Sequence, residues 1–314
     1  MWRRPLFAAI ERVFPDIDRL RIWSRLDVAA PLAGESLLEA RIDARLRPYR
    51  PFISAAILGF TLSCVWLVYG AAADAGRHLG GWLSLALPFA LGFLVHGLYI
   101  LVVHEATHGN LYGRRADDWI ASVGAGALLL PFTAEVFPHV HRIHHRIANR
   151  QGDTNWSPFR DRLFQRSRFL YGLYELVPVV NSLDRLRERT PRDGRRVLAA
   201  WIAAAAVVFV LRPPPVHWAL VVVGLNTATV LRFWIEHFGE WRGRISNTYW
   251  FPFGFGIGNH EVHHKAPTIS AVALWLGLWF RRKDVTPLAA LRLACSPRYR
   301  HFRTYQPDYD GSNA

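Results

Sequence analysis

Residues 82–108 read WLSLALPFALGFLVHGLYILVVHEATH, an apolar run that ends in two histidines. A membrane helix needs about 20 apolar residues to cross a bilayer, and Trp82 to Val103 supplies that length. His104 and His108 follow at once, and residues four apart lie on one face of a helix. The stretch therefore predicts a transmembrane helix whose end presents a pair of imidazoles to a metal ion.

Two further histidine clusters have spacings that suit one helical face. They are His141-Arg-Ile-His144-His145 and His260-Glu-Val-His263-His264. Eight clustered imidazoles are more than a single ion uses, since a zinc site takes four ligands from the protein. We therefore expect a site for two ions. Imidazole binds Zn, Cu, Fe and Ni, so the ligand type alone does not name the metal.

Four segments are long and apolar enough to be membrane helices. They are Phe52 to Ala73, Trp82 to Val103, Val197 to Leu211 and Val216 to Ile235. The third, with about 15 residues, is short for a bilayer. The sequence thus predicts an all-α integral membrane protein, with four transmembrane helices in two hairpins.

Arginine is distributed unevenly along the chain. The loops within the two hairpins hold one arginine each, whereas the first 50 residues hold ten and residues 114–196 hold fifteen. By the positive-inside rule, we expect both termini, and a helical cap carrying the di-metal site, on the cytoplasmic side. Lys265 and Lys283 are the only lysines. Such arginine bias is typical of GC-rich bacteria, so we expect a bacterial inner membrane.

Three other apolar stretches do not predict further spans. Trp119 to Phe137 contains Gly124, Gly126 and Pro131, and a crossing there would separate histidines that share a site; we expect it to be re-entrant or interfacial. Leu274 to Phe280 is too short to cross, and Ile10 to Leu26 is amphipathic, so both are predicted to be interfacial. We divide the chain into a cytoplasmic N-terminal segment (1–51), a membrane domain (52–280) and a cytoplasmic tail (281–314).

The net charge of +14 would suggest nucleic-acid binding in a soluble protein. The apolar spans instead assign the arginines to anionic lipid headgroups, and we expect no nucleic-acid partner. Cys64 and Cys295 are the two cysteines, too few for an iron–sulfur cluster held by four thiolates. Any electrons would come from another protein.

The single histidines differ in what they indicate. His237 ends the fourth predicted span as His104 ends the second, and we expect it to be a ninth ligand. His96 lies within a span, where ionisable groups are rarely idle, and His139 lies two residues before the second cluster. The sequence assigns neither a role.

The three clusters, in this order and at these places, resemble the histidine boxes of the membrane fatty acid desaturase and hydroxylase superfamily. The resemblance runs from about Phe52 to Pro267 and includes Asn259, just before the last box. It implies a non-haem di-iron centre, O2 as co-substrate, a lipid substrate in the bilayer and external reductant. The chain has no His-Pro-Gly-Gly haem motif, consistent with a separate ferredoxin, rubredoxin or cytochrome-type donor. An extra histidine near the end of the fourth span, here His237, is common in the family.

Neighbouring polar side chains are expected to orient the ligands. The candidates are Glu105, Asp153, Glu236, Glu240, Asn259 and Glu261. Phe93, Tyr99 and Trp234 are candidates to line a substrate groove.

Alternatives remain at this stage. His104-Glu105-Ala-Thr-His108 satisfies a zinc-protease signature, two Glu-x-x-His spacings occur in ferritin-like di-iron bundles, and a non-catalytic metal binder or transporter is a third class. Within the superfamily, desaturation, hydroxylation and ketone formation all stay open. The Glu236-His237-Phe-Gly239 and Asn247-Thr-Tyr249 stretches resemble the carotenoid hydroxylase branch.

Overall fold

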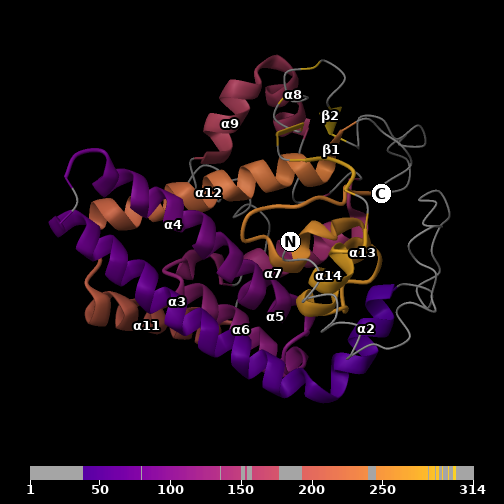
Figure 1. The fold of residues 1–314 in the computed structure, drawn as a ribbon, viewed down its shortest axis with the longest axis horizontal. Coiled ribbons are helices and arrows are strands. Elements are labelled where there is room, and N and C mark those ends of the chain that lie inside the picture. Colours follow the sequence, from indigo (N-terminus) through magenta and orange to yellow (C-terminus); the bar gives the residue numbers. More distant parts are fainter. Residues whose placement is uncertain are drawn as a thin grey trace, which may run out of the picture.

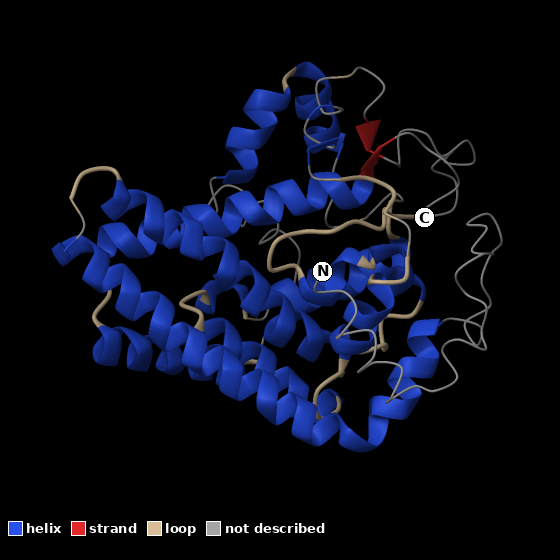
Figure 2. Cartoon of the chain, in the orientation of Figure 1, coloured by secondary structure: helices blue, strands red, loops and turns tan. Residues whose placement is uncertain are grey.

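The computed structural model shows an almost entirely helical chain (Figures 1 and 2). It describes residues 38–281 except 79, 135, 150–152, 154–157, 177–192 and 240–244, and beyond them residues 283–286, 288, 289, 292, 296, 300 and 301. Within these residues, the strands β1 (Phe238–Gly239) and β2 (Arg300–His301) form one short antiparallel pair. The N-terminal stretch Ile10 to Leu26 lies outside the described residues.

Four long helices dominate the fold. They are α3 (Arg50–His78), α4 (Leu83–Tyr99), α11 (Gly194–Leu211) and α12 (Pro215–His237). Among the described residues, four stretches containing these helices are long and apolar enough to cross a membrane. The chain is therefore an all-α integral membrane protein with four transmembrane helices, as the sequence predicts.

The third helix is longer than its apolar run. It has 18 residues and begins at Gly194, three residues before the predicted start at Val197. Asp193 caps it, because its carboxylate accepts a hydrogen bond of 3.0 Å from the backbone N–H of Arg195. A capping side chain satisfies one of the free N–H groups at a helix start, so polar residues extend this helix to a membrane-spanning length.

The outer surface of the long helices is apolar. On α11, Trp201 is 54% exposed and Phe209 75%, and only 11% of this span is buried within the protein. A contiguous exposed apolar surface would be an aggregation site in water. In a bilayer it is the surface that faces the lipid tails.

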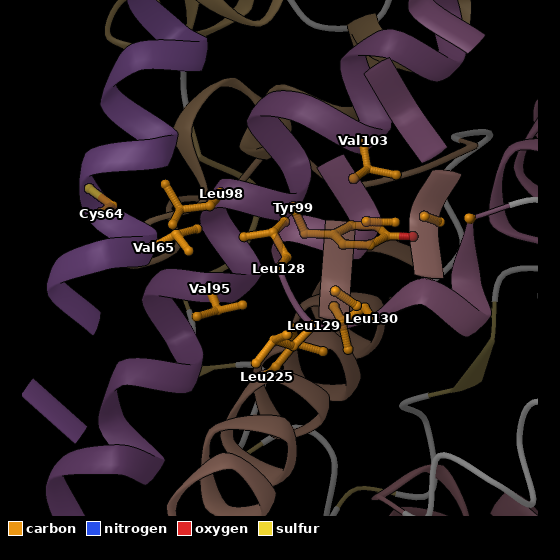
Figure 3. Packing of buried hydrophobic residues seen from close by; sticks show 14 of the residues in the cluster. Cys64, Val65, Val95, Leu98, Tyr99, Val103, Leu128, Leu129, Leu130 and Leu225 are labelled. Atoms are coloured by element: carbon orange, nitrogen blue, oxygen red, sulfur yellow. The ribbon is translucent and has the colours of Figure 1, made fainter. Parts of the chain in front are cut away.

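The main hydrophobic core lies between the long helices and α6 (Arg114–Ala127). Figure 3 shows Val65 of α3 beside Val95 and Leu98 of α4, with Leu128 and Leu225 adjoining them. These buried contacts hold α4 in the middle of the fold.

Two glycines allow α4 and α12 to touch through their backbones. A Cβ on Gly224 would lie 2.0 Å from the carbonyl oxygen of Phe89, and a Cβ on Gly92 would lie 2.3 Å from that of Val221. Small residues are common where membrane helices approach closely. This contact fixes the relative position of the two helices whose far ends carry histidines.

The segment Trp119 to Phe137 forms no fifth span among the described residues. It comprises the end of α6, a short helix η4 (Pro131–Thr133) and the beginning of α7 (Val136–Ile147). A Cβ on Gly126 would lie 2.1 Å from the carbonyl oxygen of Ala200, so α6 packs closely on α11. The chain can then return to the same end of the molecule.

The shorter helices gather at one end of the long ones (Figure 1). They are α2 (Leu38–Leu46), η2 (Arg47–Tyr49), η3 (Ile100–His104), α5 (Glu105–His108), α8 (Pro158–Arg166), α9 (Arg168–Leu176), η5 (Phe255–Gly258), α13 (His260–Lys265) and α14 (Ala271–Leu278). On α14, Leu274 is buried in a cluster with Ile42 of α2, while Trp275 is exposed. The predicted interfacial position of this stretch stays a prediction.

We expect Gly224→Val to destabilise the protein by about 1–3 kcal/mol or more, because overpacking at a close contact forces the backbone apart. Gly59→Val on α3 is the matched control, since nothing lies within 4 Å of a Cβ there. Thermal unfolding of the purified protein in detergent measures the difference. Equal unfolding temperatures for the two variants would contradict the proposed backbone contact.

Candidate metal centre

The first histidine box stands where α4 changes its helical form. After Tyr99 the chain makes a π-helical turn, η3, and the N–H of Glu105 bonds to the carbonyl of Ile100, five residues back. Such turns are rare and occur frequently at functional sites. The helix then ends at Gly109, whose φ of +79° favours glycine. His104 and His108 thus occupy the last turns of a continuous helical segment that begins in the membrane.

The second box lies on α7, and the third opens α13. The start of α13 is tied to α2, far away in sequence. Asn259 accepts a backbone hydrogen bond of 3.0 Å from His263, and its side-chain amide donates to Glu39 Oε1 at 2.7 Å. Arg281 forms an ion pair with the buried Glu39 at 2.6 Å. Residues that flank the membrane domain therefore hold the third box in place.

Nine histidines form two groups. They are the eight of the three boxes and His237, the last residue of α12. In each group, one ligand atom per residue lies within 4.8 Å of all the others. The first group contains His104, His108, His141, His145 and His263, and the second contains His144, His237, His260 and His264. All nine histidines expected from the sequence are present in these groups.

Helical spacing explains how each box serves both groups. In the second box, His141 and His145 are four residues apart and face the first group, while His144 faces the other group. In the third box, His260 and His264 face the second group, and His263 faces the first. The two groups adjoin, since the rings of His145 and His264 stack at 4.5 Å.

The nitrogen atoms fit bound metal ions. A metal–imidazole bond is about 2.0–2.1 Å long, which puts neighbouring ligand nitrogens about 3 Å apart. The Nε2 atoms of His108 and His141 are 3.0 Å apart, and those of His260 and His264 are 3.2 Å apart. Among the described residues, the buried Nε2 atoms of His104 and His263 have no hydrogen-bond partner. Buried polar atoms are rarely left unsatisfied, and both of these belong to the first group, so an ion at the centre of that group would satisfy them.

Burial sets the protonation state of the ligands outside the spans. Desolvation, followed by the charge of neighbouring histidines, lowers the pKa of His145 to about 2. The same causes, in the same order, bring the pKa of His141, His260, His263 and His264 well below the usual value. Neutral imidazole is the form that binds metal, so these residues need no proton release at neutral pH.

With the fold and the two histidine groups described, the chain can be compared with known proteins. The fatty acid desaturase family model matches residues 80–275, which include every histidine of both groups. The chain belongs to the fatty acid desaturase family. The searches of curated proteins and of solved structures each found no significant match.

Family membership fixes the general activity. This desaturase-family protein is a membrane oxidoreductase of the kind that oxidises lipid chains, by desaturase-type or hydroxylase-type chemistry. Members of the family generally depend on two irons. The zinc-protease and ferritin-like alternatives find no support in this comparison.

Three acidic side chains of the desaturase-family site face histidine Nδ1 atoms. Asp153 is 2.9 Å from His144 Nδ1, and its other oxygen accepts from the N–H of Asn149. Glu236 lies 3.4 Å from His260 Nδ1. Glu105 lies 3.4 Å from His104 Nδ1. The Asp153 contact is a hydrogen bond, and a carboxylate bonded in this way to the far nitrogen fixes the tautomer and orientation of a ligating histidine. Among the described residues, Nδ1 of His104 and of His260 has no hydrogen-bond partner.

Other expected neighbours are placed differently. Glu261 accepts a hydrogen bond from the N–H of Ser246 and pairs with Lys265, so in the described structure it supports a loop rather than a histidine ring. Asn259 acts through the backbone and through Glu39, as described above. Glu240 lies outside the described residues. His139 belongs to neither group.

A cavity of about 160 Å³ reaches the histidines of both groups. Its walls come from α4, α7, α12 and η4, and include Tyr99, Leu130 and Phe233. Tyr99 thus lines the cavity, as expected for the groove. Phe93 and Trp234 do not: Phe93 stacks on Phe251 at 6.4 Å, and Trp234 packs with Phe164 and Tyr171.

Sequence analysis missed two residues at this site. Arg232 is an arginine inside the fourth span, a signal that itself marks a functional position, and its guanidinium pairs with Glu236 at 2.5 Å. The hydroxyl of Tyr249 also donates to Glu236. Burial, followed by the charge of Glu236, raises the pKa of Tyr249 well above its usual value, so it remains a donor.

We expect Asp153→Asn to lower the affinity of the second group for metal by roughly 10–100-fold, because His144 would lose the carboxylate that orients it. Glu261→Gln is the matched control, since its carboxylate contacts Ser246 and Lys265. Competition with a chelator of known affinity measures both variants. If they lose affinity equally, Asp153 does not act through His144.

Proposed function

We propose that this desaturase-family protein uses O2 to desaturate or hydroxylate an aliphatic lipid chain at a histidine-ligated di-iron centre. The observation that carries the proposal is the cavity. Apolar residues of the long helices line it, and histidines of both groups line it too. A lipid chain in this cavity would place a C–H bond beside the centre.

The proposed ligands are the two histidine groups, one iron to each. The first iron would have five imidazoles and the second four. When bound, the two irons would supply the reductive activation of O2 that an unactivated C–H bond requires. With five imidazoles, the first ion would have fewer free coordination positions than the second. We therefore assign the ion with more open coordination to the second group.

The residues around the centre position and shield it. Asp153 holds the proton of His144 on Nδ1, which leaves Nε2 free to bind metal. Arg232 and Tyr249 compensate the buried charge of Glu236, which faces His260. Ile100 and Val230 line the cavity beside the histidines and would exclude water from the reacting carbon.

The structure argues against a protease at the first box. The carboxylate of Glu105 already accepts hydrogen bonds from the N–H of Ala271 at 2.6 Å and from the side chain of Asn110 at 3.3 Å. Both bonds end on Oε2, and the other oxygen, Oε1, lies 3.4 Å from Nδ1 of His104. A general base directs an oxygen at a water molecule, whereas neither oxygen of Glu105 is turned away from these protein partners. Glu105 instead joins the first box to α14.

We further propose that the centre lies on the cytoplasmic side of a bacterial inner membrane, and that a separate electron-transfer protein reduces it. The distribution of arginine supports the cytoplasmic placement, because ten arginines lie before residue 51 and fifteen in residues 114–196. Cys64 is buried among core residues of the long helices, so it is not available for an iron–sulfur cluster.

Metal analysis tests the centre. We expect purified protein to hold one iron for each histidine group, and His145→Ala and His144→Ala each to lose about one ion, because each removes one ligand from a different group. His139→Ala on the same helix is the control and should keep both. A single zinc ion that survives both ligand substitutions would overturn the proposal.

Oxidation is tested separately. With a reductant and a donor protein, O2 consumption should depend on lipid and disappear in His144→Ala. Mass spectrometry of lipids from expressing cells then separates loss of two hydrogens from gain of oxygen, and acyl chains from carotenoids. Iron without lipid-dependent O2 consumption would indicate a non-catalytic metal protein.

A further inference from the structure

His96 lies inside the second span, two helical turns before His104, and it is not a member of either histidine group. Its side chain is 2% exposed and lines the cavity. Nδ1 of His96 is 3.3 Å from the hydroxyl of Thr229 on α12. The residue therefore bridges two membrane helices at the wall of the cavity.

The hydrogen bond of Thr229 decides the tautomer of His96. The threonine hydroxyl has a single hydrogen, which it donates to the carbonyl of Leu225 at 2.9 Å. With that hydrogen on Leu225, only the lone pairs of the oxygen remain for His96, and Nδ1 of the ring is then the donor. A charged imidazolium at this depth would be costly. In the neutral ring, Nε2 is then an acceptor.

This acceptor has no partner among the described residues. Leaving a buried polar atom unsatisfied is unfavourable, so Nε2 needs a donor from a ligand. One turn before Thr229 on α12, Asn226 also lines the cavity, and its Nδ2 donor likewise has no partner in the described part of the chain. Residues three apart are neighbours on a helix face, so Asn226 and the Thr229 partner of His96 share one face, and the free donor and the free acceptor belong to residues that line the same cavity.

A hydroxyl group matches both atoms, since it donates one hydrogen bond and accepts others. A carbonyl or an ether oxygen could accept from Asn226 but could give nothing to His96. Arg232, the cation on the same helix as Asn226, is already paired with Glu236, so its charge is not available to an anion.

We propose that His96 and Asn226 form a binding site for a hydroxyl group on the lipid substrate. The proposal rests on the proposed function and narrows its substrate class to lipid alcohols. His96 is eight residues from His104, which is roughly 12 Å along a helix. The hydroxyl would therefore be held at a distance from the carbon that is oxidised. Apolar residues such as Leu225 and Val230 also line the cavity.

The size of the cavity agrees with this use. Its volume of about 160 Å³ is near that of an engineered apolar cavity of about 150 Å³ that binds benzene. It holds a segment of a chain rather than a whole lipid. In so small a space, one buried polar contact has a large influence on which segment enters.

Binding to the purified, metal-containing protein tests the site without relying on turnover. The probes are a long-chain primary alcohol, its methyl ether and the alkane of equal length, and the readout is the ligand-dependent rise in unfolding temperature. We expect the alcohol to bind at least about tenfold more tightly than either analogue, because the analogues leave the His96 acceptor unpaired.

Two variants and one control locate the effect. His96→Phe and Asn226→Leu should remove the preference for the alcohol. Thr227→Val should keep it, because Thr227 lies one residue from Asn226 but donates its hydroxyl to Val223 within its own helix. The series on the unaltered protein is decisive even where a variant does not fold.

Each result has a distinct meaning. Equal binding of all three probes would overturn the site and would indicate a resident water between His96 and Asn226. A methyl ether that binds more tightly than the alcohol would overturn the tautomer argument, because its oxygen can only accept hydrogen bonds. Preference for the alcohol in a protein that consumes no O2 would leave the site standing and would reject the proposed oxidation instead.

Discussion

The gathering of nine imidazoles at one place, seven of them buried, is the constraint on which the rest of this structure depends. Each ring has two nitrogens, and each buried nitrogen needs a partner. Protonation cannot provide one, because burial and mutual repulsion keep rings such as His145 and His263 neutral. Two metal ions would satisfy the converging Nε2 atoms, and Asp153 accepts a hydrogen bond from the opposite nitrogen of His144. The histidines therefore require both the ions and an outer layer of acceptors.

That requirement explains why the fold draws on distant parts of the chain. The helix α12 ends in the ligand His237, and α4 continues through η3 and α5 to the ligands His104 and His108. The glycine contact at Gly92 and Gly224 fixes α4 and α12 relative to each other. The third box has only a six-residue helix, too short to be stable alone. Glu39, Asn259 and Arg281 hold it through charged hydrogen bonds. Rigid placement of this kind is what a precise metal site needs.

Much of this arrangement could be predicted from the sequence, because it depends on local periodicity. Apolar length located four spans, and the spacing of four residues identified histidines that share a face. The division of the boxes between the two groups was not predictable, because it depends on how α7 and α13 face each other. For the same reason Glu105, Glu236 and Glu261 looked alike as acids beside histidines. Only tertiary contacts show that Glu261 turns to Ser246 and Lys265.

The cavity is a case in which a local signal was present in the sequence but was not used. Asn226, Thr229, Arg232 and Glu236 recur along α12 at nearly the helical period, so they form one polar stripe on a membrane helix. Such a stripe cannot face lipid tails without a large energetic cost, and all four residues line the cavity. Three of its members have partners within the protein: Thr229 bonds to Leu225, and Arg232 pairs with Glu236, which also accepts from Tyr249. Among the described residues, Asn226 and His96 on the facing helix retain polar atoms without partners. The part of the stripe near the histidines is therefore structural, and Asn226, at its far end, is the part assigned to ligand binding.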